Sequence, residues 1–222
     1  MKIRLFPLLT VALLTSCNVK PELRKDIKQF ISNFSLANAV EHYKTGHAVS
    51  TKETIEGNNS TKEVEEITYS CLDDVHPTYL KVVTNFENGV ETSKDTLEFV
   101  EIEGQYYLLT NGVYEESSLK ECTKLITSFF YKKVEVDGSY HTQGYYYGDY
   151  IREVAPVLQK YVTIDTVNEL YNYEYSVTES KDGETVNMAQ KYSVDKWGML
   201  VSNHVLTESS NKTIARSIYV NN

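Results

Sequence analysis

The residue types that support catalysis or metal binding are scattered through this chain. The sequence has no Gly-x-Ser-x-Gly nucleophile elbow, no glycine-rich phosphate loop, no dinucleotide fingerprint and no His-Glu-x-x-His motif. Its five histidines lack the spacing of metal ligands. The stretch Asp73-Asp74-Val75-His76 has oxygens that suit a hard cation, but these are also ordinary turn residues before Pro77. We therefore predict a protein without catalytic residues, metal site or cofactor.

The most specific motif in the chain ends at Cys17, where an apolar N-terminal run stops. Lys2 and Arg4 precede an apolar run at 5–14 that is too short to span a bilayer, a pattern typical of a secretory signal. The run ends in Leu14-Thr15-Ser16-Cys17, which resembles the lipobox of bacterial lipoproteins. This resemblance implies a signal peptide at 1–16, a diacylglycerol joined through a thioether to the Cys17 sulfur, and a tether at 17–21.

Lipidation at Cys17 would place the protein at the extracytoplasmic face of a bacterial cell membrane. One acyl chain holds a protein only marginally, whereas two anchor it stably. Cleavage would remove Lys2 and Arg4 but no acid, which leaves 20 basic and 31 acidic residues and changes the net charge from −9 to −11. That charge should hold the folded domain off an anionic leaflet.

The composition is that of an ordinary folded domain. The chain has 222 residues, of which 41% are hydrophobic and 24% charged, and this excludes both intrinsic disorder and a polytopic membrane protein. The acidic balance also argues against a nucleic-acid partner. No repeat or low-complexity linker interrupts the sequence after the tether, so residues 22–222 are predicted to form a single domain.

Two cysteines, Cys71 and Cys122, remain once Cys17 is modified. An extracytoplasmic compartment permits a disulfide between them, but cysteine also packs as a small hydrophobe. The sequence leaves both outcomes open.

Hydrophobic periodicity predicts four helical segments. Apolar residues at helical spacing begin at Leu23, a short piece follows an N-cap at Ser35, and a third helix spans 117–134 after a Ser118-x-x-Glu121 capping box. A fourth contains Ile151 and Leu158, with Pro156 either kinking it or opening its first turn.

Alternation with period two predicts strands in two blocks, joined by dipeptides such as Asn88-Gly89 that close hairpins. The expected strands are 47–56, 63–72, 78–87, 90–102 and 105–110, then 167–178, 186–194, 199–207 and 212–220. In the third strand Leu80, Val82, Thr84 and Phe86 share one face, and Lys81 and Asn85 the other, a pattern typical of a sheet wet on one side.

This order of elements predicts an α+β fold: a large curled antiparallel sheet, or half-open barrel, with helices packed on its concave face. In layout it resembles the family of lipoprotein carriers and lipid-binding lipoproteins that includes LolA. That resemblance implies an apolar cavity for acyl chains between the sheet and the helices.

Tyrosine is the compositional outlier, at 18 of 222 residues. Its densest run, between 140 and 150, is expected to form a flexible loop. Tyrosine rings in such a loop suit sugar stacking, protein recognition or the mouth of an apolar pocket. An alternative is that these rings only fill half-buried positions of a sheet. The candidate ligand-binding residues are Phe129, Phe130, Tyr145, Tyr146, Tyr147, Leu158, Tyr171, Tyr173 and Tyr175.

The sequence therefore favours a membrane-anchored, non-catalytic lipoprotein that binds a lipid or other apolar small molecule between sheet and helices. The alternative is a surface recognition or adhesion module whose tyrosine-rich loop binds glycan or an envelope protein.

Overall fold

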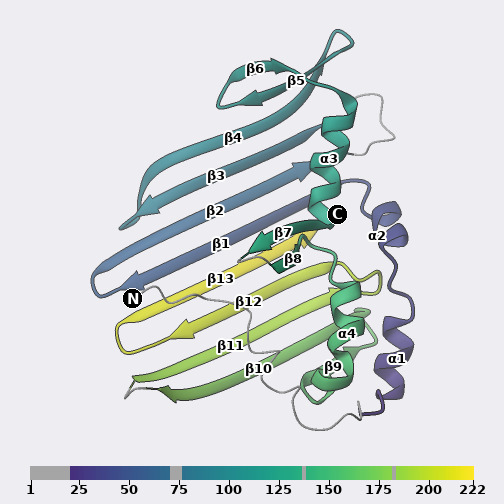
Figure 1. Cartoon of the computed structure of the whole chain (residues 1–222), viewed down its shortest axis with the longest axis vertical. Helices are drawn as coiled ribbons and strands as arrows, with labels where there is room; N and C mark the ends of the chain where they lie inside the picture. Colours follow the sequence, from purple (N-terminus) through teal and green to yellow (C-terminus); the bar gives the residue numbers. More distant parts are fainter. Residues whose placement is uncertain (1–20, 71–76, 137–138, 182–183) are drawn as a thin grey trace.

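The computed structural model describes residues 21–70, 77–136, 139–181 and 184–222 (Figure 1). The helices in these residues are α1 (Lys25–Ile31), α2 (Leu36–His42), α3 (Leu119–Phe130) and α4 (Gly148–Leu158), the last followed by the 3₁₀ turn η2 (Gln159–Tyr161). The strands are β1 (Gly46–Glu56), β2 (Asn59–Tyr69), β3 (Tyr79–Glu87), β4 (Val90–Ile102), β5 (Gln105–Thr110), β6 (Val113–Glu116), β7 (Lys132–Val136), β8 (Ser139–Gln143), β9 (Val162–Asp165), β10 (Leu170–Lys181), β11 (Glu184–Asp195), β12 (Leu200–Glu208) and β13 (Lys212–Asn221).

Eleven of these strands form one open antiparallel sheet in the order β6-β5-β4-β3-β2-β1-β13-β12-β11-β10-β9. Each half of the sheet is a meander, and the two halves meet where β1 pairs with β13 from His47–Asn221 to Glu56–Lys212. The predicted fold class, a large antiparallel sheet with helices, is confirmed.

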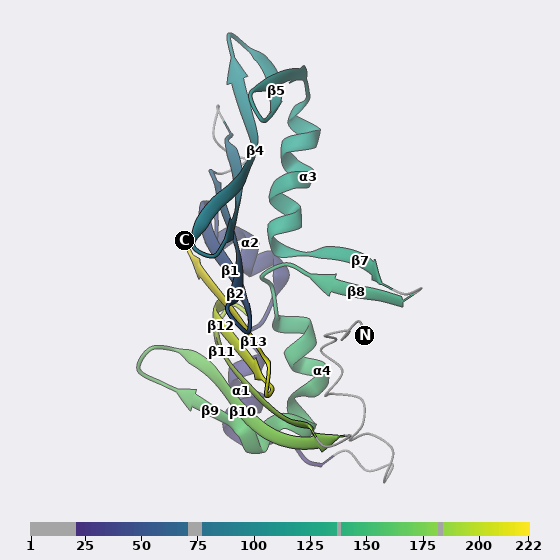
Figure 2. The same cartoon turned by 90° about the vertical axis from the view of Figure 1, so that its left-hand side faces the viewer.

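The helices gather at one end of the strands (Figure 1). Figure 2 shows α3, the separate hairpin β7-β8 and α4 on the same side of the sheet. The predicted N-cap of α2 is confirmed, because the Ser35 hydroxyl accepts a hydrogen bond from the Asn38 amide. The predicted capping box of α3 is wrong, since the Ser118 side chain makes no capping hydrogen bond and the Glu121 carboxylate pairs with Lys124 instead.

The hairpin turns explain why the meander was readable in the sequence. Both central residues have positive φ, as type I′ turns require, at Asn88-Gly89, Glu103-Gly104 and Asn111-Gly112. The two asparagine side chains also accept backbone N–H groups across the sheet, from Ser60 at 2.8 Å and from Thr96 at 2.7 Å. The turn between β1 and β2 contains Gly57, whose φ is 62°.

Four short strands differ from the expectation. The edge strands β6 and β9 have only four residues each, too few for a clear alternation. The helix predicted to reach Val134 ends at Phe130, because the chain turns extended at Tyr131 and pairs as β7 with β8. The tyrosine-rich segment expected to be a loop therefore contains strand β8 and the start of α4. Pro156 lies inside α4 rather than in its first turn.

Cross-strand register identifies the side of the sheet that faces the helices. Tyr171 of β10 lies 6.5 Å from Phe30 of α1, measured between ring centroids, so β10 presents its tyrosine face to the helices. In β3 the helix side carries Tyr79 and Lys81, while Leu80 points the opposite way and is 38% exposed. The helices therefore cover the face of β3 that carries Tyr79 and Lys81, and not the more apolar face that carries Leu80. The reason is that Tyr79 pairs with Tyr69 of β2, and both rings are buried on the helix side.

The signal peptide, Cys17, Cys71 and the Asp73–His76 stretch lie outside the described residues. Cys122 is a buried free thiol among the described residues. In the same part of the chain, no three His, Cys, Asp or Glu side chains form a set suited to a metal ion. None of the helices described has the length and apolarity needed to cross a membrane.

Candidate ligand-binding site

Aromatic rings fill the space between α3 and the sheet. Phe129 lies with its ring centroid 4.8 Å from that of Tyr69 and 4.7 Å from that of Tyr145, both in edge-to-face geometry. Phe130 packs beside them, 5.7 Å from Phe129. These separations are those of direct ring contact, so the predicted lining residues on α3 contact one another and the sheet.

A second aromatic group occupies the space between α4 and strands β10–β11. Tyr192 stacks on Tyr173 at 4.7 Å and 22°, and on Tyr171 at 6.4 Å and 14°. Tyr147, just before α4, meets Tyr192 edge-on at 5.9 Å. Leu158 is also in this core, 7% exposed. A ligand at these positions would have to displace side chains that already pack together.

Burial keeps these tyrosines neutral. It raises the pKa of Tyr173 to about 12, and it also raises the pKa of Tyr145, Tyr171 and Tyr192 above the ordinary 10. The rings therefore act as hydrogen-bond donors and acceptors rather than as anions at any physiological pH.

Several polar atoms in this core have no hydrogen-bond partner among the described residues: the hydroxyls of Tyr146, Tyr171 and Tyr192, and Oδ1 of Asn203. The Asn203 amide nitrogen lies 3.5 Å from the Tyr147 hydroxyl, at the limit of a hydrogen bond. Unpartnered buried groups are energetically costly. The tyrosine rings of this core are thus well packed, but several of their hydroxyl groups lack hydrogen bonds.

The tyrosine-rich segment contributes rings to the core. Tyr145 is 9% exposed, Tyr146 is 4% exposed, and Tyr147 is half-buried. Tyr146 fits against glycine, since a Cβ added to Gly148 would lie 2.5 Å from its hydroxyl oxygen. These three rings therefore hold α3 to α4 and are not presented as a row to solvent.

Tyr175 differs from the other predicted residues because it begins an apolar surface that extends beyond the helices. Register places six side chains on the helix side of four neighbouring strands, and we call this set the apolar strip: Tyr175, Val177, Met188, Val205, Ile214 and Ile218. Ile214 is 9% exposed and the others are half-buried. The strip is continuous with the tyrosine core, because Tyr173 and Tyr175 are successive inward residues of β10.

Sequence analysis missed the last five members of the strip. The start of β11 carried part of the signal, since the apolar residues Val186 and Met188 alternate with the polar residues Thr185 and Asn187. Without the strand order, nothing in the sequence indicated that these faces lie side by side.

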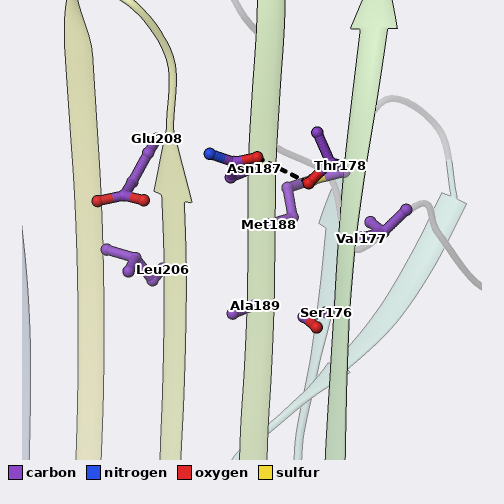
Figure 3. Close-up of a pocket in the computed structure, with 8 residues that line it drawn as sticks. All are labelled: Ser176, Val177, Thr178, Asn187, Met188, Ala189, Leu206 and Glu208. Carbon is purple, nitrogen blue, oxygen red and sulfur yellow. Dashed lines mark hydrogen bonds between the residues drawn. The ribbon is translucent and has the colours of Figure 1, made fainter.

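A groove crosses the opposite face of the same strands. One part has a volume of about 190 Å³ (Figure 3) and the other about 360 Å³. Most of the lining residues point away from the helices by register, and small side chains such as Ser176, Ala189 and Ala215 form its floor. Its rim carries Glu53, Glu208 and other polar groups. Charged residues, among them Glu174 and Lys191, border this groove.

Comparison with known proteins gives a structural likeness but no sequence-based family. No known protein-family profile matches the sequence, and no curated protein matches it. Among solved structures, the chain is similar to the crystal structure of LprF from Mycobacterium bovis, with 10% sequence identity over 90% of this chain and 93% of that one, at a TM-score of 0.28.

Proposed function

We propose that this protein is a non-catalytic lipoprotein, anchored through Cys17 to the extracytoplasmic face of a bacterial membrane, and that it binds an acyl chain or similar apolar ligand. The proposed binding surface is the apolar strip rather than the filled core. The observation that carries this proposal is the set of buried and half-buried apolar side chains on four adjacent strands, on the side of the sheet that the helices only partly cover.

The strip is large enough to contact part of one acyl chain. Four strands at about 4.8 Å spacing span about 14 Å, and Ile214 to Ile218 covers about 13 Å along β13. Complete removal of an 18-carbon chain from water contributes on the order of 10 kcal/mol, and contact along one side contributes about half of that. Because association has its own entropic cost, the expected binding is weak and reversible, as transient carriage requires.

A neutral fluorescent probe, N-phenyl-1-naphthylamine, tests the binding surface in the unlipidated full chain Cys17→Ser. Met188→Glu should abolish most of the fluorescence enhancement, because it places a charge in the strip. The matched control is Ala189→Glu, which introduces the same charge on the neighbouring residue of β11 but on the other face.

Circular dichroism would confirm that both variants fold. Loss of probe binding in Ala189→Glu alone would indicate that the probe binds in the outer groove and not on the strip. Unchanged binding in both variants would refute the strip as the ligand surface.

Mass spectrometry of organic extracts from purified Cys17→Ser protein tests the ligand class. Co-purifying acyl lipid at a defined ratio supports the proposal. Its absence, together with no probe binding, would overturn apolar carriage.

A further inference from the structure

Two cations stand side by side at the edge of the apolar strip. Arg216 of β13 and Lys52 of β1 are directly opposite in the antiparallel register. Arg216 also lies opposite Val205, whose inward position follows from its pairing with Gln190 and hence with Tyr175. Both cations therefore project from the helix side of the sheet.

Neither cation is neutralised within the described residues. No ion pair or hydrogen bond joins the side chain of Lys52 or Arg216 to any described group, although other lysines of the sheet are paired: Lys81 with Glu65 at 2.5 Å and Lys212 with Glu56 at 2.9 Å. Glu63 faces Lys52 across β1 and β2, but no ion pair forms between them within 4.0 Å. Like charges directly opposite on a sheet destabilise it, so an anion between them would be favourable.

The strip and the cations adjoin one another. Ile214 and Ile218 flank Arg216 two residues away on the same face of β13, and Val205 lies beside it on β12. From Arg216 the helix side continues across β12 and β11 to Tyr175 and Val177, with Gln190 and Thr207 as the polar residues among the apolar ones. One end of the surface is thus cationic and the rest is mostly apolar, which is the complement of an amphiphile with an anionic head.

We propose that the strip binds a long-chain carboxylate, with its acyl chain on the strip and its carboxylate between Arg216 and Lys52. This inference rests on the proposed function, because it names the ligand class of that same surface. The planar guanidinium of Arg216 matches the two oxygens of a carboxylate, and Lys52 supplies a second charge. From Arg216 a single acyl chain can lie across the strands of the strip, over about 14 Å.

Isothermal titration tests the assignment with two ligands of equal chain length, each below its micelle concentration. Sodium dodecanoate has the anionic head, and glycerol monododecanoate is neutral. In the Cys17→Ser chain, the double variant Arg216→Gln, Lys52→Gln should weaken dodecanoate binding about tenfold and leave binding of the neutral ester within about twofold.

Lys191→Gln is the matched control. Lys191 is an exposed cation of β11 on the outer face, opposite His204. Lys191→Gln removes one positive charge, as each substitution of the double variant does, but it lies on the face opposite the strip. It should leave both affinities within about twofold, whereas raising the salt concentration should weaken dodecanoate binding by the unsubstituted chain alone.

The outcomes separate this inference from the proposed function. Equal affinity for both ligands, unaffected by the double variant, would overturn the carboxylate site while keeping apolar binding. Binding of neither ligand would overturn both. A loss of both ligands in the double variant would show that the cations support the sheet, and would also overturn the assignment.

Discussion

Two buried tyrosines that differ in hydrogen bonding give a direct test of the core. Tyr192 is 1% exposed and its hydroxyl has no partner among the described residues, whereas the Tyr69 hydroxyl, in a residue that is 2% exposed, donates to the Tyr43 carbonyl at 2.7 Å. Replacing either by phenylalanine removes one oxygen and leaves the ring. The two substitutions should therefore change stability with opposite sign.

The magnitudes follow from the hydrogen bonds. Tyr192→Phe removes an uncompensated buried hydroxyl and should raise the free energy of unfolding by about 1 kcal/mol. Tyr69→Phe loses a hydrogen bond and leaves a buried carbonyl without its donor, and should lower it by about 1 to 2 kcal/mol. In a domain of this size each kcal/mol shifts Tm by about 2–4 °C.

Urea unfolding of the two variants, followed by circular dichroism, measures both changes. The ring contacts are unchanged in each variant, so packing serves as the internal control. Destabilisation of Tyr192→Phe by 1 kcal/mol or more, a figure of the same order as one hydrogen bond, would refute the reasoning. It would mean that an ordered water or a ligand group satisfies the hydroxyl.

Three further results are expected. Phe129→Ala should lower the free energy of unfolding by about 3–5 kcal/mol, because a ring that is 2% exposed leaves a cavity, while Val90→Ala, at 67% exposure, should change it by less than about 0.5 kcal/mol in urea unfolding. Cys17→Ser should release the protein from the membrane fraction and abolish labelling by radioactive palmitate; retention of either would contradict the anchor. Burial raises the pKa of Tyr79 and Tyr173 to about 12. Their contribution to the free energy of unfolding is therefore complete below pH 10 and is lost as pH rises toward 12. Absorbance at 295 nm should show that these two tyrosines ionise together with unfolding and not at pH 10.

The sheet was predictable where local chemistry specifies it. Asn-Gly and Glu-Gly turns adopt type I′ geometry, and β4 and β5 fall at the expected residues. The hairpin β7-β8 was not predictable, because Phe129 and Phe130 continue into Tyr131 without a helix-stop signal. Pairing with β8, a non-local interaction, ends the helix there.

The faces of the strands were harder to assign than the strands themselves. Leu80, Val82 and Phe86 give β3 a clear apolar face, but the buried contact of Tyr69 with Phe129 sets the register of the neighbouring strands. Tertiary packing thus overrides the local pattern. The candidate site shows the same effect of tertiary packing. Alternation identified the face of β10 that carries Tyr171, Tyr173 and Tyr175, but the neighbouring rings determine which of these side chains are buried in the core.

The relative sizes of the layers explain why an apolar surface remains available. Helices α3 and α4 have 12 and 11 residues, which at 1.5 Å per residue makes each about 17 Å long. The sheet spans about 48 Å across its strands, and β10 alone has 12 residues, or about 40 Å. Because such short helices cover only part of such a sheet, the apolar alternation of β10–β13 continues past them. Only part of this surface packs against the core, through Tyr175 and Ile218, so an occupant best explains the half-buried apolar residues beyond them, and the cations beside them define its charge.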